Sequence, residues 1–150
     1  MKRRAIMAVD VGSHRTGVAV SDDERRMALP LETIETRALN EVADRLRELI
    51  DDYGVGHVVV GWPVDMEGRR GRSTDRVEVL IEHLKQRLMR AGLEIPLETW
   101  DERMSSSSAD RLLIEADVSR QRRKEAIDQV AATKILEGYL GRLNFEKGQR

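Results

Sequence analysis

The sequence predicts an α/β protein built on one mixed sheet of five strands, flanked by helices. Three apolar or alternating segments come first, separated by short polar turns, which is typical of an antiparallel meander. From residue 40 onward, segments with helical spacing of apolar residues alternate with strand-like segments. Such alternation indicates parallel strands joined by right-handed crossovers. The length of 150 residues is that of one domain, covering residues 1–150.

Five segments carry the strand signal. Residues 4–11 and 16–21 are predicted to form a hairpin with Gly-Ser-His as its turn, and residues 26–35 complete the meander. Pro30 cannot donate a hydrogen bond to a neighbouring strand, so we expect this third strand at an edge of the sheet. Residues 57–63 are continuously apolar, as a central strand buried on both faces would be. Residues 95–100 give a short fifth strand, and the first, fourth and fifth strands are expected to be parallel neighbours.

Four segments carry the helix signal. Asn40 is expected to cap a first helix that Gly54 ends. Ser73 or Thr74 is expected to cap a second helix that Gly92 ends. A serine-capped helix over 105–116 and a long helix over 122–141 follow. The predicted inner faces of the first two helices consist of Val42, Leu46, Leu49, Ile50, Tyr53, Val77, Leu80, Ile81, Leu84 and Leu88.

Composition narrows the functional class. The net charge of −1 means that attraction to nucleic acid or anionic lipid must come from local basic clusters. Two such clusters are Arg69, Arg70 and Arg72, and the group at residues 120–124. The absence of cysteine excludes disulfides and thiolate metal sites and suits the cytoplasm. The apolar stretch before Asp10 is too short for a signal peptide or a membrane span, so we expect a cytoplasmic protein without membrane contact.

Three carboxylates are predicted to meet at one edge of the sheet. Asp10 leaves the first strand and Glu102 follows the fifth, and ligands of open sheets bind beyond the carboxyl ends of parallel strands. Asp128 shares a helical face with Ala132 and Ile135, where a carboxylate needs a cation or a donor. A final helix antiparallel to the strand before it would bring its early turns to the same edge. Such hard oxygen ligands suit two Mg²⁺ or Mn²⁺ ions, which favour phosphodiester hydrolysis.

Each of these residues also has a simpler interpretation. Asp10 could be a turn residue, Glu102 could interact with a helix dipole, and Asp128 could pair with Lys124 or Lys134. The serine run could only cap a helix, and the arginine-rich loop could either solvate the surface or contact phosphates. The joint placement of the three carboxylates favours the catalytic interpretation.

Four motifs together resemble the YqgF/RuvX family. They are AVDVGSHRTGVAVSD, VVVGWPVDMEG, WDERMSSSSA and IDQVAATKILEGYL, and they cover most of the chain in the expected order. The resemblance implies a ribonuclease-H-like fold and assigns Asp10, Glu102 and Asp128 as catalytic and metal-binding residues. His14 and Trp62 stand where the family more often has a basic residue and a leucine, so differences are expected in substrate contacts rather than in the metal site.

The expected function is that of a metal-dependent endonuclease acting on structured RNA or branched DNA. The family resemblance implies processing of the 5′ end of pre-16S ribosomal RNA or, alternatively, resolution of Holliday junctions. We expect the nucleic acid to contact basic residues around the carboxylates, namely Arg15, Arg69, Arg70, Arg72 and Arg103. The chain is expected to be a monomer or a weak homodimer, and a resolvase would need two active sites at one junction.

Two interpretations from other classes use the same residues. A nucleic-acid-binding module could keep the fold without catalysis, although the three carboxylates argue against this. The pattern D-x-G-x-x-x-x-G, starting at Asp10, also resembles the first phosphate loop of sugar kinases and actin-like ATPases. Those proteins close two lobes around a nucleotide, whereas 150 residues supply one.

Overall fold

A computed structural model describes residues 3–63, 72–101 and 120–148. The strands within these ranges are β1 (Ala5–Val11), β2 (Thr16–Ser21), β3 (Ala28–Ile34), β4 (Val55–Trp62) and β5 (Leu97–Asp101). The helices within them are α1 (Leu39–Asp52), α2 (Arg72–Arg90) and α4 (Arg120–Gly148). None of these helices is long and apolar enough to cross a membrane. The helix predicted over 105–116 lies outside the described residues.

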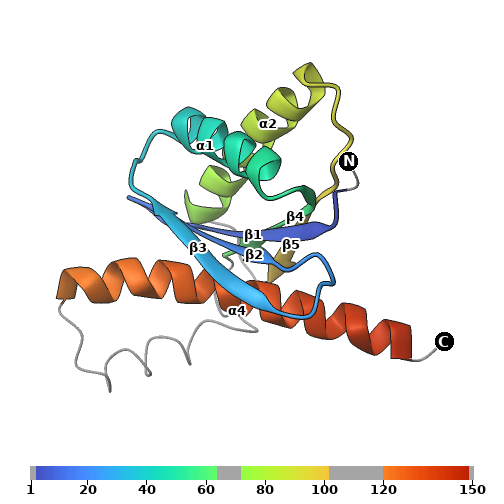
Figure 1. The fold of residues 1–150 in the computed structure, drawn as a ribbon. Helices are drawn as coiled ribbons and strands as arrows, with labels where there is room; N and C mark the ends of the chain where they lie inside the picture. The colour runs from blue at the N-terminus through green and yellow to red at the C-terminus, as the bar shows by residue number, and fades with distance from the viewer. Residues whose placement is uncertain (1–2, 64–71, 102–119, 149–150) are drawn as a thin grey trace.

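The five strands form one mixed sheet in the order β3-β2-β1-β4-β5. Strands β1, β2 and β3 pair antiparallel, whereas β4 pairs parallel with both β1 and β5. This confirms the predicted meander and the predicted parallel trio. Pro30 lies in β3, an edge strand as expected, and β4 lies between two partners. Helices α1 and α2 cover one face of the sheet and α4 covers the other (Figure 1).

Alternate residues of β1 pack on opposite sides of the sheet. Met7 and Val9 join the apolar core beneath α1 and α2, which we call the α1/α2 side. Ile6 and Ala8 join a smaller core with Ala132 and other residues of α4, which we call the α4 side. All five side chains are fully buried. This period of two sets the side on which every later residue of β1 lies, Asp10 included.

Three predicted details of the first two helices were wrong. Helix α1 begins at Leu39 with Ala38 as its N-cap, so Asn40 lies inside the helix and does not cap it. No side chain of the described residues caps the helix. Just before it, the Thr36 hydroxyl accepts a hydrogen bond from the Ala38 amide and donates one to Glu41 of the first turn. Tyr53 is 46% exposed because it follows the last helical turn.

The cap predicted for the second helix was also wrong. Ser73 and Thr74 lie inside α2, which includes Arg72. Thr74 is fully buried, so its position belongs to the packed face of the helix. The predicted helix ends are confirmed, since Gly54 and Gly92 follow α1 and α2 with positive φ angles of 61° and 70°.

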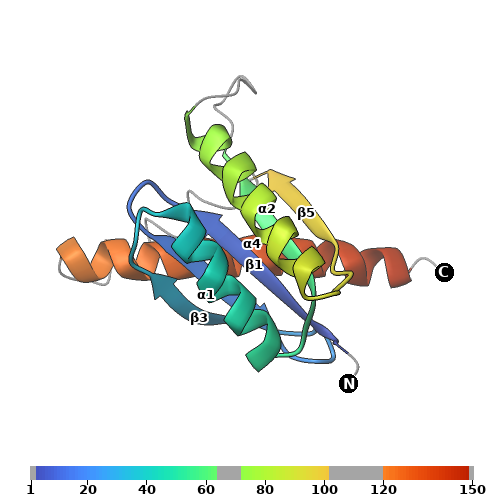
Figure 2. The same ribbon diagram turned by 90° about the horizontal axis from the view of Figure 1, so that it is seen from above.

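Helix α4 runs longer than predicted and in a different direction. It covers Arg120–Gly148 rather than 122–141. It crosses beneath the strands instead of running antiparallel to β5 (Figure 2). Its packing explains this path, because its buried residues Ala132 and Ile135 share a core with Ala8 and Ala19 of the meander. Small side chains on both surfaces let the helix lie close to β1 and β2.

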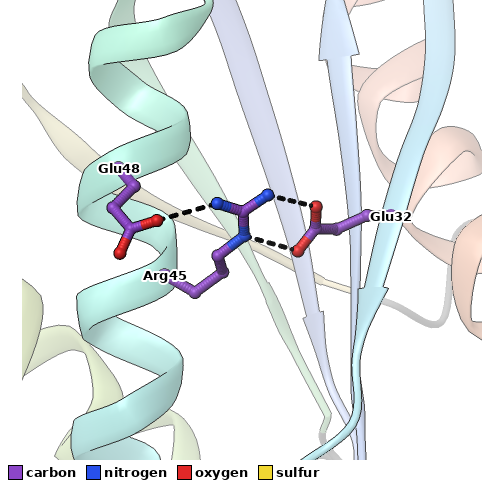
Figure 3. A network of polar contacts seen from close by, with 3 residues as sticks. All are labelled: Glu32, Arg45 and Glu48. Carbon is purple, nitrogen blue, oxygen red and sulfur yellow. Dashed lines mark hydrogen bonds and ion pairs between the residues drawn. The ribbon is translucent and has the colours of Figure 1, made fainter.

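A polar contact ties the edge strand β3 to α1. The Arg45 guanidinium donates two hydrogen bonds of 2.8 Å to the Glu32 carboxylate of β3, and a third of 2.8 Å to Glu48, one turn along α1 (Figure 3). The two carboxylates raise the pKa of Arg45. A bidentate pair of this kind fixes orientation as well as proximity, so it holds the outer strand against the helical layer.

Candidate functional site

Asp10 lies near the carboxyl end of β1, opposite Gly17 of β2. Because Ala8 faces α4, the alternation of the strand places Asp10 on the α4 side as well. The residue is partly buried. The backbone of Asp10 is thus fixed by a strand that is paired on both sides, and the residue lies near the carboxyl end of that strand.

Glycines stand beside Asp10 on both neighbouring strands. Gly17 pairs with Asp10 directly. On the other side Val9 pairs with Val60, so Gly61 is the next residue of β4 beside Asp10. Cross-strand neighbours normally bring their side chains within about 5 Å of each other. The Asp10 carboxylate therefore has no side chain beside it from the adjacent position of either strand.

Position 128 belongs to the backbone of α4, and the Asp128 side chain lies outside the part of the structure that is described. This position is one helical turn before Ala132, which is fully buried with Ala8 and Ala19. Asp10 is two residues beyond Ala8 on the same side of the sheet. Of the three predicted carboxylates, the structure thus describes the Asp10 side chain, which lies on the side of the sheet that α4 covers.

The remaining predicted site residues are described only in part. Arg72 belongs to the first turn of α2. Glu102, Arg69, Arg70 and Arg103 lie outside the described residues. Within the described part of the chain, no group of three or more histidine, cysteine, aspartate or glutamate side chains is placed to hold a metal.

Asp101 is a carboxylate that the sequence analysis passed over in favour of Glu102. It is the last residue of β5 and pairs with Trp62 at the end of β4, at the same edge of the sheet as Asp10. Trp100 packs on the α4 side, so the alternation of β5 places Asp101 on the α1/α2 side. The sequence signal was present, because Asp101 and Glu102 both come directly after the predicted strand 95–100.

The turn after Asp10 is tightly closed. The Gly12 amide donates a 2.9 Å hydrogen bond to the Arg15 carbonyl. A Cβ atom at Gly12 would lie only 2.5 Å from that carbonyl oxygen, so no other residue fits without a shift of the backbone. The turn carries exposed His14 and partly buried Arg15. Arg15 therefore lies at the far end of this closed turn, five residues after Asp10 and directly before β2.

Arg76 also contacts this turn, and the sequence analysis did not identify it. Its Nη2 atom donates to the carbonyl oxygens of Gly12 and Arg37, each at 3.3 Å. A signal existed, because Arg76 lies one helical turn before Leu80 on the apolar face of α2. A cation on that face needs polar partners.

A second polar cluster lies on the α4 side, nearer the amino ends of β4 and β5 than Asp10, since His57 pairs with Ile6 and Glu98 with Val59. His57 Nε2 of β4 is 3.1 Å from the Glu98 carboxylate of β5 and 3.1 Å from the Tyr139 hydroxyl of α4. Arg142 donates to Glu98 at 3.1 Å and lies over the Trp100 ring, 5.1 Å from its centroid. We call His57, Glu98, Tyr139 and Arg142 the amino-end cluster, because His57 and Glu98 lie in the first halves of β4 and β5. Trp100 lies farther along β5, where it pairs with Gly61.

Hydrogen bonding dominates the electrostatics of this cluster. Partial burial raises the pKa of the Glu98 carboxyl, but hydrogen bonds from its three neighbours outweigh this and hold the pKa below its usual range. Burial raises the pKa of Tyr139, and the adjacent Glu98 carboxylate raises it further. The carboxylate is thus the acceptor on which the other groups converge.

Solved structures with a similar fold cover most of the chain. A Thermus thermophilus RuvC in complex with a Holliday junction substrate is 13% identical, with a TM-score of 0.58 over 93% of this chain and 95% of that one. The yeast mitochondrial Holliday junction resolvase is 12% identical, with a TM-score of 0.55 over 93% and 78%. At such identities the likeness concerns the fold, and it confirms the predicted ribonuclease-H-like architecture.

Curated relatives are far more similar in sequence. A protein of Desulforamulus reducens is 41% identical over 135 residues, which is 90% of this chain and 95% of the relative. One of Moorella thermoacetica is 44% identical over 138 residues, 92% and 95% of the two chains. Both are described as "Putative pre-16S rRNA nuclease". A family model described as "RuvX: Holliday junction resolvase" matches residues 4–142. The chain therefore belongs to the RuvX family.

Proposed function

We propose that this chain is a divalent-metal-dependent endonuclease that trims the precursor of 16S ribosomal RNA, with residues 1–150 acting as one cytoplasmic domain. The observation that carries the proposal is the position of Asp10. It lies near the carboxyl end of β1, the central strand of the sheet, on the side that α4 covers. The descriptions of the close relatives support a nuclease and favour this RNA substrate.

The donor chemistry at this edge fits Mg²⁺ or Mn²⁺. Asp10 supplies a partly buried carboxylate, and hard divalent cations prefer carboxylate oxygen. Asp10, Glu102 and Asp128 would hold the metal, and two ions are the expected number. When bound, such ions lower the pKa of water and stabilise negative charge on phosphate oxygens. The rigid β1 backbone would hold Asp10 in place for this purpose.

Basic residues around the carboxylates would bind and orient the nucleic acid. Arg15 lies on the turn that follows Asp10, close to where a phosphodiester would have to lie. We propose the same role for Arg69, Arg70 and Arg72 before and at the start of α2, and for Arg103. Because such contacts go to phosphates, they would give affinity and register rather than sequence preference.

Resolution of Holliday junctions is the second candidate function. The description of the family model and the fold shared with junction resolvases favour it. A resolvase must present two active sites to one four-way junction, so this function would require a homodimer on the substrate. A monomer at working concentration would favour the RNA nuclease.

The experiment that tests the proposal compares the wild-type protein with Asp10→Asn and the control Asp52→Asn. Asp52 is an exposed carboxylate of α1, so the control makes the same chemical change away from the site. Three labelled substrates are offered with Mn²⁺ or Mg²⁺: a pre-16S fragment, unrelated single-stranded RNA and a synthetic four-way DNA junction.

We expect metal-dependent cleavage of the pre-16S fragment by the wild type and by Asp52→Asn. Asp10→Asn should lose at least about 100-fold in rate, because even residues that only support metal ligands cost 10- to 100-fold. Cleavage of the junction alone would replace the RNA substrate with the second candidate. Equal activity of Asp10→Asn and wild type, or no cleavage of any substrate, would refute the catalytic proposal.

A further inference from the structure

Two loops that border Asp10 are joined through one side chain of α2. The Gly12 carbonyl belongs to the β1–β2 turn, and the Arg37 carbonyl belongs to the segment between β3 and α1. The Nη2 atom of Arg76 donates to both at 3.3 Å. These contacts span 64 and 39 residues of sequence, so Arg76 joins three segments that are otherwise distant in the chain.

The Arg76 side chain is partly buried. Its Nε atom is buried and has no hydrogen-bond partner within the described part of the chain. Arg76 also precedes Val77, which is fully buried in the core beneath α1 and α2. The side chain is thus anchored at its base by helix packing, while its tip reaches the two carbonyls.

Two carbonyls of the β1–β2 turn have different partners. The internal hydrogen bond of the turn joins the Gly12 amide to the Arg15 carbonyl and leaves the Gly12 carbonyl for Arg76. Gly12 is only two residues beyond Asp10. A change in the tilt of this peptide would therefore act on both the Asp10 backbone and the position of Arg15.

We propose that Arg76 is a positioning residue that clamps the turn following Asp10 to α2 and to the Arg37 segment, and so sets the geometry of the nuclease site. The inference rests on the proposed function, because its kinetic consequence requires cleavage. Arg76 acts through the backbone and touches neither the metal nor the substrate. An error of about 1 Å in the placement of reacting groups can cost 100-fold in rate, so a contact of this kind affects kcat.

The test uses Arg76→Met, Arg76→Lys and the control Arg90→Met. Methionine keeps much of the apolar stem but donates no hydrogen bond, and lysine restores a donor that reaches fewer acceptors. Arg90 is an exposed arginine at the other end of the same helix, so its replacement makes the same change in charge. Hydrogen exchange of the amides at residues 12–16 and 37–38 is measured without metal, alongside kcat, KM and thermal stability.

We expect on the order of tenfold faster exchange in these two segments for Arg76→Met, with the amides of β4 unchanged. The kcat should fall about tenfold with little change in KM, Arg76→Lys should recover part of both effects, and Arg90→Met should match wild type. Unchanged exchange, faster exchange throughout the sheet, or an unchanged kcat would each overturn the inference. If the wild type cuts no substrate, the proposed function fails, and the exchange of the two segments still decides whether Arg76 clamps them.

Discussion

The two ends of the α4 side carry the same kinds of residue in opposite arrangements. At the amino end, the Glu98 carboxylate is paired with His57 and Arg142. The neighbouring Tyr139 is only 4% exposed, so its side chain is shielded from solvent. At the carboxyl end, Asp10 stands beside two glycine positions and next to a turn that Arg76 holds from outside. Both ends contain a carboxylate on the α4 side. Glu98 contacts His57 and Arg142 of its own cluster, whereas Asp10 has glycine at the adjacent position of each flanking strand.

This difference leads us to expect a stabilising role for the amino-end cluster and, in the proposed nuclease, a catalytic role for Asp10. A carboxylate surrounded by donors has its interactions completed within the protein and contributes to stability. A carboxylate with space on both flanking strands can accept a ligand from outside. Substitutions at the amino end should therefore change stability and leave activity intact, whereas those at the carboxyl end should reduce activity beyond their effect on stability.

The largest effect is expected for Gly12→Ala at the carboxyl end. The new Cβ would meet the Arg15 carbonyl oxygen at 2.5 Å, so the turn must open. We expect a loss of about 1–3 kcal/mol in the free energy of unfolding, measured with urea. Cleavage should fall by more than the loss of folded protein explains.

The matched control is Gly141→Ala on the exposed surface of α4. A Cβ there meets nothing within 4 Å. Replacing glycine by alanine inside a helix should stabilise the protein by about 0.5–1 kcal/mol and leave cleavage unchanged. If Gly12→Ala behaved like this control, the turn would not be tightly closed.

An intermediate effect is expected for Tyr139→Phe at the amino end. The ring stays against His57 and Trp100, but the hydroxyl is lost from the His57 and Glu98 side chains. We expect a loss of about 1 kcal/mol of stability by urea denaturation, the net value of one hydrogen bond. The cleavage rate should equal that of wild type. A marked loss of cleavage at unchanged stability would contradict the separation of the two ends.

The smallest effect is the pH dependence that Glu98 confers. Its pKa is lowered in the folded protein, so its contribution to stability is present above its ordinary value of 4.5 and is lost as pH falls through the lowered folded value. The wild type should be more stable than Glu98→Gln near neutral pH, and the difference should shrink as the pH falls below 4.5. Urea titrations across this range measure it. A difference that stays constant with pH would show that the charge of the Glu98 carboxylate contributes nothing to stability. The control is Glu94→Gln, because Glu94 is an exposed acid before β5.

Sequence patterns determined much of the architecture. The three strands before residue 40 and the alternation after it predicted the sheet order, because periods of two and of 3.6 report which faces must be buried. Pro30 at an edge and the apolar β4 in the centre follow from what their residues can donate or bury. The position of Asp10 after an apolar strand, and the motifs shared with the RuvX family, also came from the residues alone.

Tertiary structure decided the details that depend on partners distant in the chain. Asn40 had the chemistry of a helix cap, but it lies inside α1 because the helix begins at Leu39, and Thr36 instead bonds the Ala38 amide just before it. The path of α4 across the sheet follows from the fit of Ala132 against Ala8 and Ala19, which no local pattern specifies. Arg76 contacts the Gly12 carbonyl because the fold brings the first turns of α2 to the β1–β2 turn. Local periodicity sets which face of a helix is buried, but it does not set which backbone carbonyl a side chain on that face reaches.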